Sequence, residues 1–394
     1  MPRNARLPPR PGIRPAPECG SRRSTFTQIH PAGLRVDSPF VLHGGSAAVS
    51  HIERVGLAPE HIACIPAAAG GPKGLALLPL DRLLHREWLA DSGQIELIGA
   101  SIGAWRMAAL AQPKPLAALE RLQHAYVHEQ RYPAKPTPLE VSRACRRLAA
   151  AVLGDRDLAV RSGAALTVVT ARARGPLAHA ESRLAFGRAL LSNSLSRRRL
   201  AHYLERVVFQ AGEHSFLARP FDEFGLVRVP IDPRNQHDAL IASGTIPLVC
   251  APVRDIGGAP DGRYWDGALV DYHLLLPYPQ LVESRRAQGL DSIVLYPHFD
   301  GRLIPGWLDK HLPWRSACRG HPWLANVLLV APSASLIERL PNRKLPDRRD
   351  FYRYGADHAG RERAWNGAIG ECGRFAEAVL RWMARPDPTL IRPI

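Results

Sequence analysis

A serine with a glycine two positions away on each side stands in the segment Gly99-Ala-Ser101-Ile-Gly103. The apolar run before it predicts a strand over residues 94–98, and apolar residues at helical spacing predict a helix over residues 102–111. A sharp turn from strand to helix crowds the residues beside its central residue, and glycine has no Cβ that could clash. The serine would be exposed at a helix N-terminus, whose dipole favours developing negative charge. This pattern predicts a nucleophile elbow with Ser101 as the nucleophile.

A second glycine-rich segment, Ala69-Gly70-Gly71-Pro72-Lys73-Gly74, lies between a strand predicted over residues 62–66 and a helix predicted over residues 75–90. Consecutive glycines let backbone N–H groups converge on an anion. Because Pro72 has no N–H, the expected donors are Gly70 and Gly71, and an acyl-transfer reaction needs such donors for its oxyanion. A phosphate loop for a nucleotide is the alternative, although the segment departs from the G-x-x-x-x-G-K-[ST] pattern.

Two later segments complete an ordered set of four. They are Ala242-Ser243-Gly-Thr-Ile-Pro247-Leu-Val-Cys-Ala-Pro252 and Trp265-Asp266-Gly267-Ala268. An Asp-Gly pair alone indicates only a turn. A glycine loop, a nucleophile elbow, an A-S-x-x-x-P block and a D-G-[AG] motif, in this order over about residues 60–280, resemble the patatin-like phospholipases.

This resemblance implies a catalytic dyad without histidine, in which Ser101 is the nucleophile and Asp266 is the base. It also implies an oxyanion hole at Gly70 and Gly71 and no metal or other cofactor. The remaining residues of the family's motifs are Lys73, Gly74, Gly99, Gly103 and Gly267. An acyl-enzyme would form on Ser101, and water activated by Asp266 would release the fatty acid.

The chain departs from the family's pattern at two places. Ala69 stands where the family commonly has a first glycine, and Asp271-Tyr272-His273 follows the D-G-[AG] motif where an Asn near a Pro is frequent. These differences concern substrate preference more than the chemistry. Lys73 occupies the basic position of the glycine loop, where it could meet a lipid phosphate or serve as a surface lysine.

A Ser–Asp–His triad of the α/β-hydrolase type is a second interpretation of the same serine. The histidines that could complete it are His298, His311, His321 and His358. Against the triad, the glycine loop precedes Ser101 by only about thirty residues and lacks the His-Gly-Gly start common in that class.

The 394 residues carry a formal net charge of +16, almost all of it from arginine, with 46% hydrophobic residues. Such a charge favours an anionic partner, and a lipid substrate with peripheral contact to an anionic membrane surface is expected. We expect no nucleic-acid partner, because no recognition motif for one is present. The six cysteines are far apart and predict buried thiols in a reducing compartment. Without an apolar run of membrane-spanning length, a cytoplasmic protein is expected.

Strand and helix signals that alternate along the chain predict an α/β protein with a three-layer patatin-type fold, in which helices flank a mostly parallel central sheet. Residues 1–40 are rich in Pro and Arg and predict a disordered basic tail. Residues 41–300 are expected to form the patatin-like catalytic domain. Residues 301–394 are expected to form a basic, partly helical extension packed on its core, with an amphipathic helix over residues 375–383.

The expected activity is serine-dependent hydrolysis of fatty acyl esters of phospholipids or lysophospholipids. A lipid acyltransferase with the same acyl-enzyme is one alternative, and a non-catalytic protein that binds lipid or an anionic surface is another. The oligomeric state is left open.

Overall fold

A computed structural model describes residues 38–394, apart from 91–92, 134, 155–156, 180–181, 214–215 and 316–319. The tail predicted over residues 1–40 therefore lies outside the described residues, except for its last three. Residues 38–394 form one compact unit.

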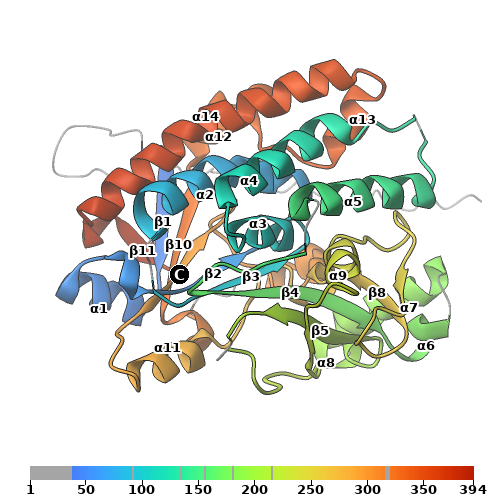
Figure 1. The fold of residues 1–394 in the computed structure, drawn as a ribbon, viewed down its shortest axis with the longest axis horizontal. Coiled ribbons are helices and arrows are strands. Elements are labelled where there is room, and N and C mark those ends of the chain that lie inside the picture. Colours follow the sequence, from blue (N-terminus) through green and yellow to red (C-terminus); the bar gives the residue numbers. More distant parts are fainter. Residues whose placement is uncertain are drawn as a thin grey trace, which may run out of the picture. The chain divides into compact units, whose positions relative to one another are not determined.

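The described strands form one mixed sheet in the order β11-β1-β10-β9-β2-β3-β4-β5-β6, and β7 and β8 continue it from β4 (Figure 1). Its centre is parallel, because β2 pairs in parallel with β9 and β3, and β3 with β4. The strands are β1 (Phe40–Gly44), β2 (Ile62–Ala67), β3 (Ile95–Ala100), β4 (Ala164–Ala173), β5 (Leu204–Ala211), β6 (Val227–Pro230), β7 (Val253–Arg254), β8 (Arg263–Asp266), β9 (Ile293–Pro297), β10 (Val327–Pro332) and β11 (Ile391–Pro393).

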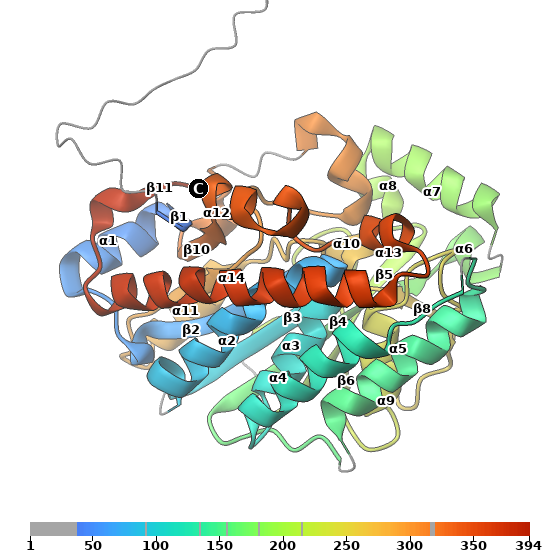
Figure 2. The same ribbon diagram turned by 90° about the horizontal axis from the view of Figure 1, so that it is seen from above.

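Helices cover both faces of this sheet. On one face α3 packs against β2, β3 and β4, and α14 runs beside α2 across that layer (Figure 2). On the opposite face α11 packs against β2 (Figure 1). The helices are α1 (Ser46–Val55), α2 (Leu78–Leu84), α3 (Ile102–Leu110), α4 (Pro115–His124), α5 (Pro138–Leu153), α6 (Gly175–His179), α7 (Arg183–Leu195), α8 (Arg197–Leu200), α9 (Gln236–Ser243), α10 (Ala268–Asp271), α11 (Tyr278–Arg286), α12 (Ala334–Arg339), α13 (Arg349–Tyr354) and α14 (His358–Ala384).

This three-layer α/β arrangement is the predicted fold class. Every residue of β2 and β3 is buried, as expected for central parallel strands that are covered on both faces. Helical structure follows each of these strands, with a 3₁₀ helix at Gly71–Leu77 leading into α2, and with α3 after β3. The two strand–turn–helix units thus start where the sequence predicted them.

The chain after residue 300 enters the same sheet. β10 lies between β1 and β9, antiparallel to β1 and parallel to β9. β11 pairs with β1 at the edge. The amphipathic segment predicted over residues 375–383 is the second half of α14, whose inner face buries Phe375, Val379 and Met383.

Among the described residues, none of the helices combines the length and the apolar composition needed to cross a bilayer.

Candidate functional site

The order of the strands brings the candidate residues together. Ala67 of β2 pairs with Gly99 of β3, so the glycine loop and Ser101 leave neighbouring strands at the same edge of the sheet. Asp266 ends β8 and pairs with Thr170 of β4. Because β3 pairs with β4 over residues 164–169 and β8 pairs with it over residues 170–172, β8 continues the line of β3 along the same edge of β4, and Asp266 lies just beyond the end of β3 that leads into Ser101.

Ser101 occupies a strained turn between β3 and α3. Its φ of 57° and ψ of −129° are unusual for a residue with a side chain, and such strain is held only by a well-packed surrounding structure. A Cβ at Gly103 would lie 1.9 Å from the carbonyl oxygen of Ala67, and one at Gly99 would lie 2.4 Å from the backbone nitrogen of Ala104. The two flanking glycines are therefore required by close backbone contacts.

Ser243, from the A-S-x-x-x-P block, fixes the backbone of this turn. Its hydroxyl accepts the N–H of Ser101 at 2.9 Å and donates to the carbonyl oxygen of Val169 in β4 at 2.7 Å. Ser243 is the last residue of α9, so this helix supplies the link between the elbow and the neighbouring strand. The sequence marked Ser243 as part of a motif without indicating this role.

Asp266 is a buried carboxylate beside the serine. Its Oδ1 accepts the N–H of Ala268 at 2.8 Å, and its own N–H donates to the carbonyl oxygen of Thr245 at 2.8 Å. Burial raises its pKa from 3.8 to about 6, and the N–H of Ala268, Arg348 and the Ser101 hydroxyl act in the opposite direction. Asp266 is therefore a stronger base than an exposed aspartate and is still largely ionised at neutral pH.

The glycine loop lies against the same edge. The N–H of Ala69 donates to the carbonyl oxygen of Tyr272 at 3.0 Å, whereas none of the described backbone hydrogen bonds uses the N–H of Gly70 or Gly71. Gly71 has a φ of +57°, a conformation that favours glycine. A Cβ at Gly70 would lie 2.6 Å from the ring of Phe299. Two backbone donors are thus available at the predicted oxyanion hole.

The other motif residues position these groups. A Cβ at Gly74 would lie 2.7 Å from Cγ1 of Ile102, so this glycine lets the loop approach α3. A Cβ at Gly267 would lie 2.3 Å from the carbonyl oxygen of Val169, which holds the turn after Asp266 against β4. The ammonium of Lys73 lies 4.8 Å from the centre of the Phe299 ring, and burial lowers its pKa.

Two cavities lie at the candidate site and share Ile246 and Arg348 in their walls. The serine cavity, of about 380 Å³, is lined by Ser101 and Gly71 together with mainly apolar side chains. Those apolar side chains include Ile102, Trp105, Tyr126, Val141, Val249 and Phe351. The aspartate cavity, of about 420 Å³, contains Asp266, Gly70 and Lys73 and is more polar, with Lys310 and Arg349 also in its wall.

Arg348 lies at the junction of these cavities and lines both of them. A Cβ at Gly71 would be 3.2 Å from its Nε, so the guanidinium stem lies over the glycine loop. Among the described residues, none forms an ion pair with Arg348, and its charge lowers the pKa of Asp266. The sequence analysis missed this residue, because the sequence around one arginine among many in a basic segment does not indicate that the side chain lies at the site.

The four histidines proposed for a triad are dispersed. His298 is buried and bonds through Nδ1 to the backbone of Asp300, and His321 caps a short turn at Trp323. His311 is exposed. His358 lines the serine cavity, but no described hydrogen bond joins it to Ser101. Asp266, by contrast, interacts with the Ser101 hydroxyl.

Four cysteines are described, and Cys64, Cys145, Cys250 and Cys372 are all buried free thiols, as predicted. Cys19 and Cys318 lie outside the described residues. Within the described part of the chain, no cluster of His, Cys, Asp or Glu could hold a metal ion.

The fold and this site define the class: an α/β protein with a serine held in a strained turn beside a buried aspartate. Residues 96–276 match the model of the patatin-like phospholipase family. This match confirms the resemblance and covers three of its four motifs, at Ser101, Ser243 and Asp266.

Among solved structures, the chain is similar to VipD from Legionella pneumophila, at 12% identity and a TM-score of 0.27. That similarity covers 67% of this chain and 54% of VipD, so the matched region spans about half the length of that protein. A search of curated proteins found no match.

Proposed function

We propose that this protein hydrolyses fatty acyl esters of phospholipids or lysophospholipids through a Ser101–Asp266 dyad. The observation that carries the proposal is the pairing of a strained, buried serine with a buried carboxylate whose pKa is raised to about 6. A carboxylate with an ordinary pKa is a poor base for an alcohol, and burial reduces that deficit.

In the first step, Oγ of Ser101 attacks the acyl carbonyl carbon while its proton passes to Asp266. The carbonyl π electrons move to the oxygen, and the resulting oxyanion accepts hydrogen bonds from the N–H groups of Gly70 and Gly71. Each such donor is worth about 3 kcal/mol in a preorganised site. The N-terminus of α3 adds a favourable dipole.

The tetrahedral intermediate then expels the alcohol, which takes the proton from Asp266, and an acyl-enzyme ester remains on Ser101. Water attacks this ester while Asp266 accepts its proton. Collapse of the second intermediate releases the fatty acid and returns the proton to Oγ of Ser101. The dyad ends in its starting state, so atoms and charge balance over the cycle.

The two cavities fit the two ends of such a substrate. The apolar wall of the serine cavity suits an acyl chain. The aspartate cavity places Lys73, Lys310 and Arg348 where a phosphate head group could be neutralised.

The test compares the wild type with Ser101→Ala, Asp266→Asn and His358→Ala on a short-chain p-nitrophenyl ester and on a phospholipid with a labelled acyl chain. Ser101→Ala should abolish turnover of both substrates, Asp266→Asn should lower it by about a thousandfold or more, and His358→Ala should keep it. Matched controls are Ser50→Ala and Asp238→Asn, at exposed or partly exposed helical positions away from the site.

Loss of activity in His358→Ala with retention in Asp266→Asn would replace the dyad by a triad. An added alcohol acceptor in the phospholipid assay separates hydrolysis from acyl transfer, because the labelled chain then appears on the acceptor. Phospholipid binding by a wild type that turns over neither substrate would instead identify a lipid-binding protein.

A further inference from the structure

The outer face of α7 exposes several leucines together with Arg188. On its inner face Ala185, Ala189 and Asn193 are buried. On the opposite side Leu184, Leu191 and Leu195, at spacings of seven and four residues, are 65%, 63% and 64% exposed. Leu190, beside them, is also exposed. A group of exposed apolar side chains on one helix commonly marks a binding surface.

A tryptophan in a neighbouring segment is also exposed. Trp314 is 70% exposed, and the next residue, Arg315, is bonded to the end of α7. The guanidinium of Arg315 donates to the side-chain oxygen of Asn193 and to the carbonyl oxygen of Ser194, each at 3.3 Å. Trp314 therefore lies near the C-terminal end of α7. We call these five residues the α7 surface: Leu184, Leu190, Leu191, Leu195 and Trp314.

The segment that carries this surface is positively charged throughout. Residues 182–204 include the arginines at 183, 188, 197, 198 and 199 and contain no aspartate or glutamate. Arg183, Arg188, Arg198 and Arg199 are exposed. Exposed leucines and a tryptophan with arginines around them suit an anionic bilayer surface, where apolar side chains enter the headgroup region and the arginines meet the lipid charges. Self-association through this face would bring like charges together, which disfavours a second copy as its occupant.

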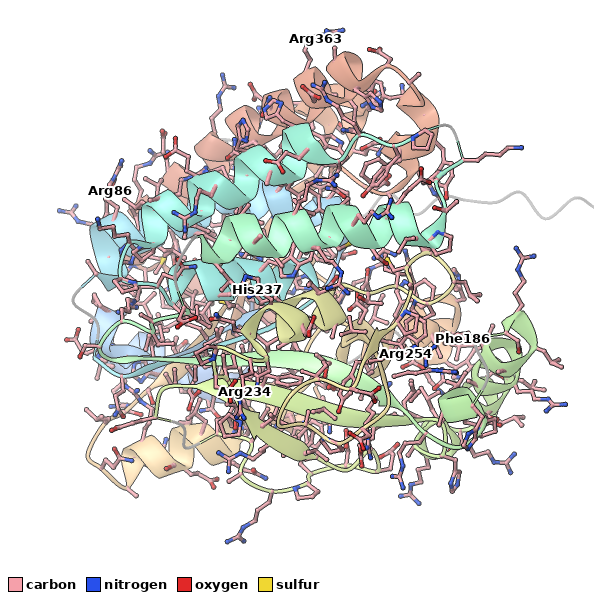
Figure 3. The ribbon with its side chains drawn as sticks, turned by 45° about the vertical axis from the view of Figure 1, so that its right-hand side comes forward. Arg86, Phe186, Arg234, His237, Arg254 and Arg363 are labelled. Carbon is pink, nitrogen blue, oxygen red and sulfur yellow. The ribbon has the colours of Figure 1, made fainter. Side chains whose placement is uncertain are left out.

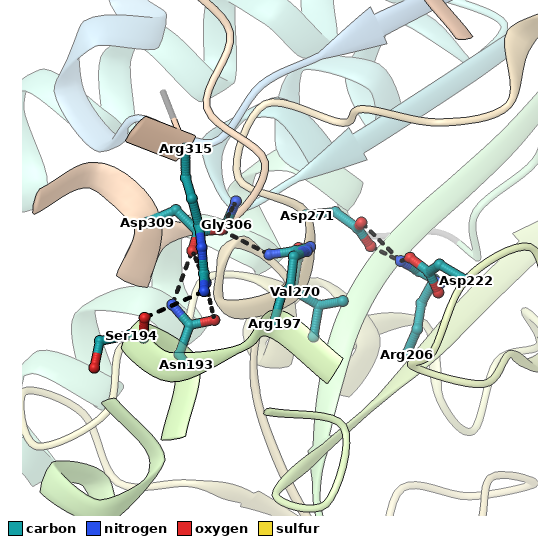
Figure 4. A network of polar contacts seen from close by, with 10 residues as sticks. All are labelled: Asn193, Ser194, Arg197, Arg206, Asp222, Val270, Asp271, Gly306, Asp309 and Arg315. Atoms are coloured by element: carbon teal, nitrogen blue, oxygen red, sulfur yellow. Dashed lines mark hydrogen bonds and ion pairs between the residues drawn. The ribbon is translucent and has the colours of Figure 1, made fainter. Parts of the chain in front are cut away.

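The surface is held rigidly. The buried carboxylate of Asp309 accepts from Asn193 at 2.8 Å, from Arg197 at 2.8 Å and from Arg315 at 3.2 Å, so α7, α8 and the segment around Trp314 are tied to one group (Figure 4). Arg197 also bonds to the carbonyl oxygen of Val270 in α10. A surface fixed in this way loses little conformational entropy when it binds.

The α7 surface is also connected to the candidate site. Phe186, on the side of α7 that faces the domain (Figure 3), packs edge-to-face against Trp265 at 5.6 Å between ring centres. Trp265 directly precedes Asp266. Trp307 packs against the same small hydrophobic cluster as α7 and lines the aspartate cavity. One cluster thus separates the α7 surface from the dyad.

We propose that the α7 surface docks on an anionic lipid bilayer and so brings membrane lipids to the serine and aspartate cavities. The delivery of membrane lipids to the site rests on the proposed lipid hydrolysis. The binding of the α7 surface to a bilayer is measured separately, without turnover.

The test uses the double variant Leu184→Glu/Leu191→Glu. Its matched control is Val55→Glu/Leu290→Glu, which changes charge equally at two exposed apolar residues on other elements. Binding is measured by co-sedimentation with phosphatidylcholine vesicles that contain or lack phosphatidylglycerol. We expect about a tenfold or greater loss of binding in the α7 variant, because each docked leucine buries apolar area, and wild-type binding in the control. Wild-type binding should depend on phosphatidylglycerol and weaken with salt.

Turnover of the short-chain soluble ester should be the same in the two doubles and the wild type, and hydrolysis of vesicle lipid should fall only in the α7 variant. Equal vesicle binding by both doubles overturns the proposal, and so does a wild-type dimer that the α7 variant alone dissociates. A wild type that binds vesicles through the α7 surface but turns over no ester contradicts the proposed function and leaves the docking surface standing.

Discussion

The hydroxyl of Ser243 accepts a hydrogen bond from the backbone N–H of Ser101 and donates one to the carbonyl oxygen of Val169 in β4. The conformation of the nucleophile is thus held by a residue far away in sequence. Ser243→Ala would leave a buried N–H and a buried carbonyl without their partner. We expect a loss of about 1–3 kcal/mol in the free energy of unfolding and a lower kcat, measured by urea denaturation and ester turnover. The exposed Ser50→Ala on α1 is the control, and equal behaviour of the two variants would contradict this role.

The raised pKa of Asp266 predicts an acidic limit to activity. In the proposed mechanism the ionised carboxylate is the base, so kcat/KM should rise about tenfold per pH unit below about pH 6 and level off above it. A pH–rate profile on the soluble ester measures this limit. An inflection near pH 4 would mean that the base is not a buried carboxylate.

The same shift predicts that Asp266 lowers stability when it is ionised. Because the folded pKa lies above the unfolded one, the folded state prefers the protonated form, and stability is lost as pH rises from 3.8 to about 6. Asp266→Asn should therefore raise the free energy of unfolding by up to about 3 kcal/mol near pH 8 and by much less near pH 4. Thermal unfolding at the two pH values tests the sign, and a destabilised variant near pH 8 would refute it.

Removal of Arg348 should shift the acidic limit upward. Its charge lowers the pKa of Asp266, so in Arg348→Gln the kinetic pKa should increase relative to wild type. Arg353→Gln, on the helix α13 that follows Arg348 directly, is exposed and serves as the control. The pH–rate profiles of the two variants test this prediction. Unchanged profiles in both would show that the charge of Arg348 does not affect the pKa of Asp266.

Two glycine substitutions should have opposite effects. In Gly103→Ala the new Cβ would meet the carbonyl oxygen of Ala67 at 1.9 Å, so we expect strong destabilisation or failure to fold. In Gly370→Ala, on α14, nothing lies within 4 Å, and alanine should stabilise the helix by about 0.5–1 kcal/mol. Thermal unfolding of both variants is the measurement. A Gly103→Ala variant as stable as the wild type would show that the elbow glycines are not required by steric contacts.

Much of the central fold was predictable because β2, β3 and the helical segments after them have local signals. Each strand is a mainly apolar run with a glycine close to at least one of its ends, and each helix has apolar residues at helical spacing. Other strands were missed for physical reasons. β8 is only four residues long and is stabilised by pairing with β4, which no local pattern reveals. β10 is a short apolar run that periodicity alone does not distinguish from a buried helix segment.

The motif residues of the candidate site could be predicted to lie together because strand ends and glycine-rich turns are recognisable in the local sequence. Ser101, Asp266 and the loop at Gly70 do lie at one edge of the sheet. Arg348 and the α7 surface were not predictable. Their importance depends on which chain segments meet in space, and an arginine or leucine in a basic helix looks the same whether it is buried, paired or exposed.

The position of β2 between β3 and β9 has a consequence for biosynthesis. The ribosome delivers β3 soon after β2, whereas β9 emerges only after all of the residues that carry the nucleophile and the aspartate. Until then one side of an entirely apolar strand has no neighbour, in a sheet whose parallel pairing is slow to form. The nascent chain therefore passes through a stage in which a strand that is fully buried in the folded protein is open to association with other chains, and chaperone capture at that stage would help to set the yield of folded protein.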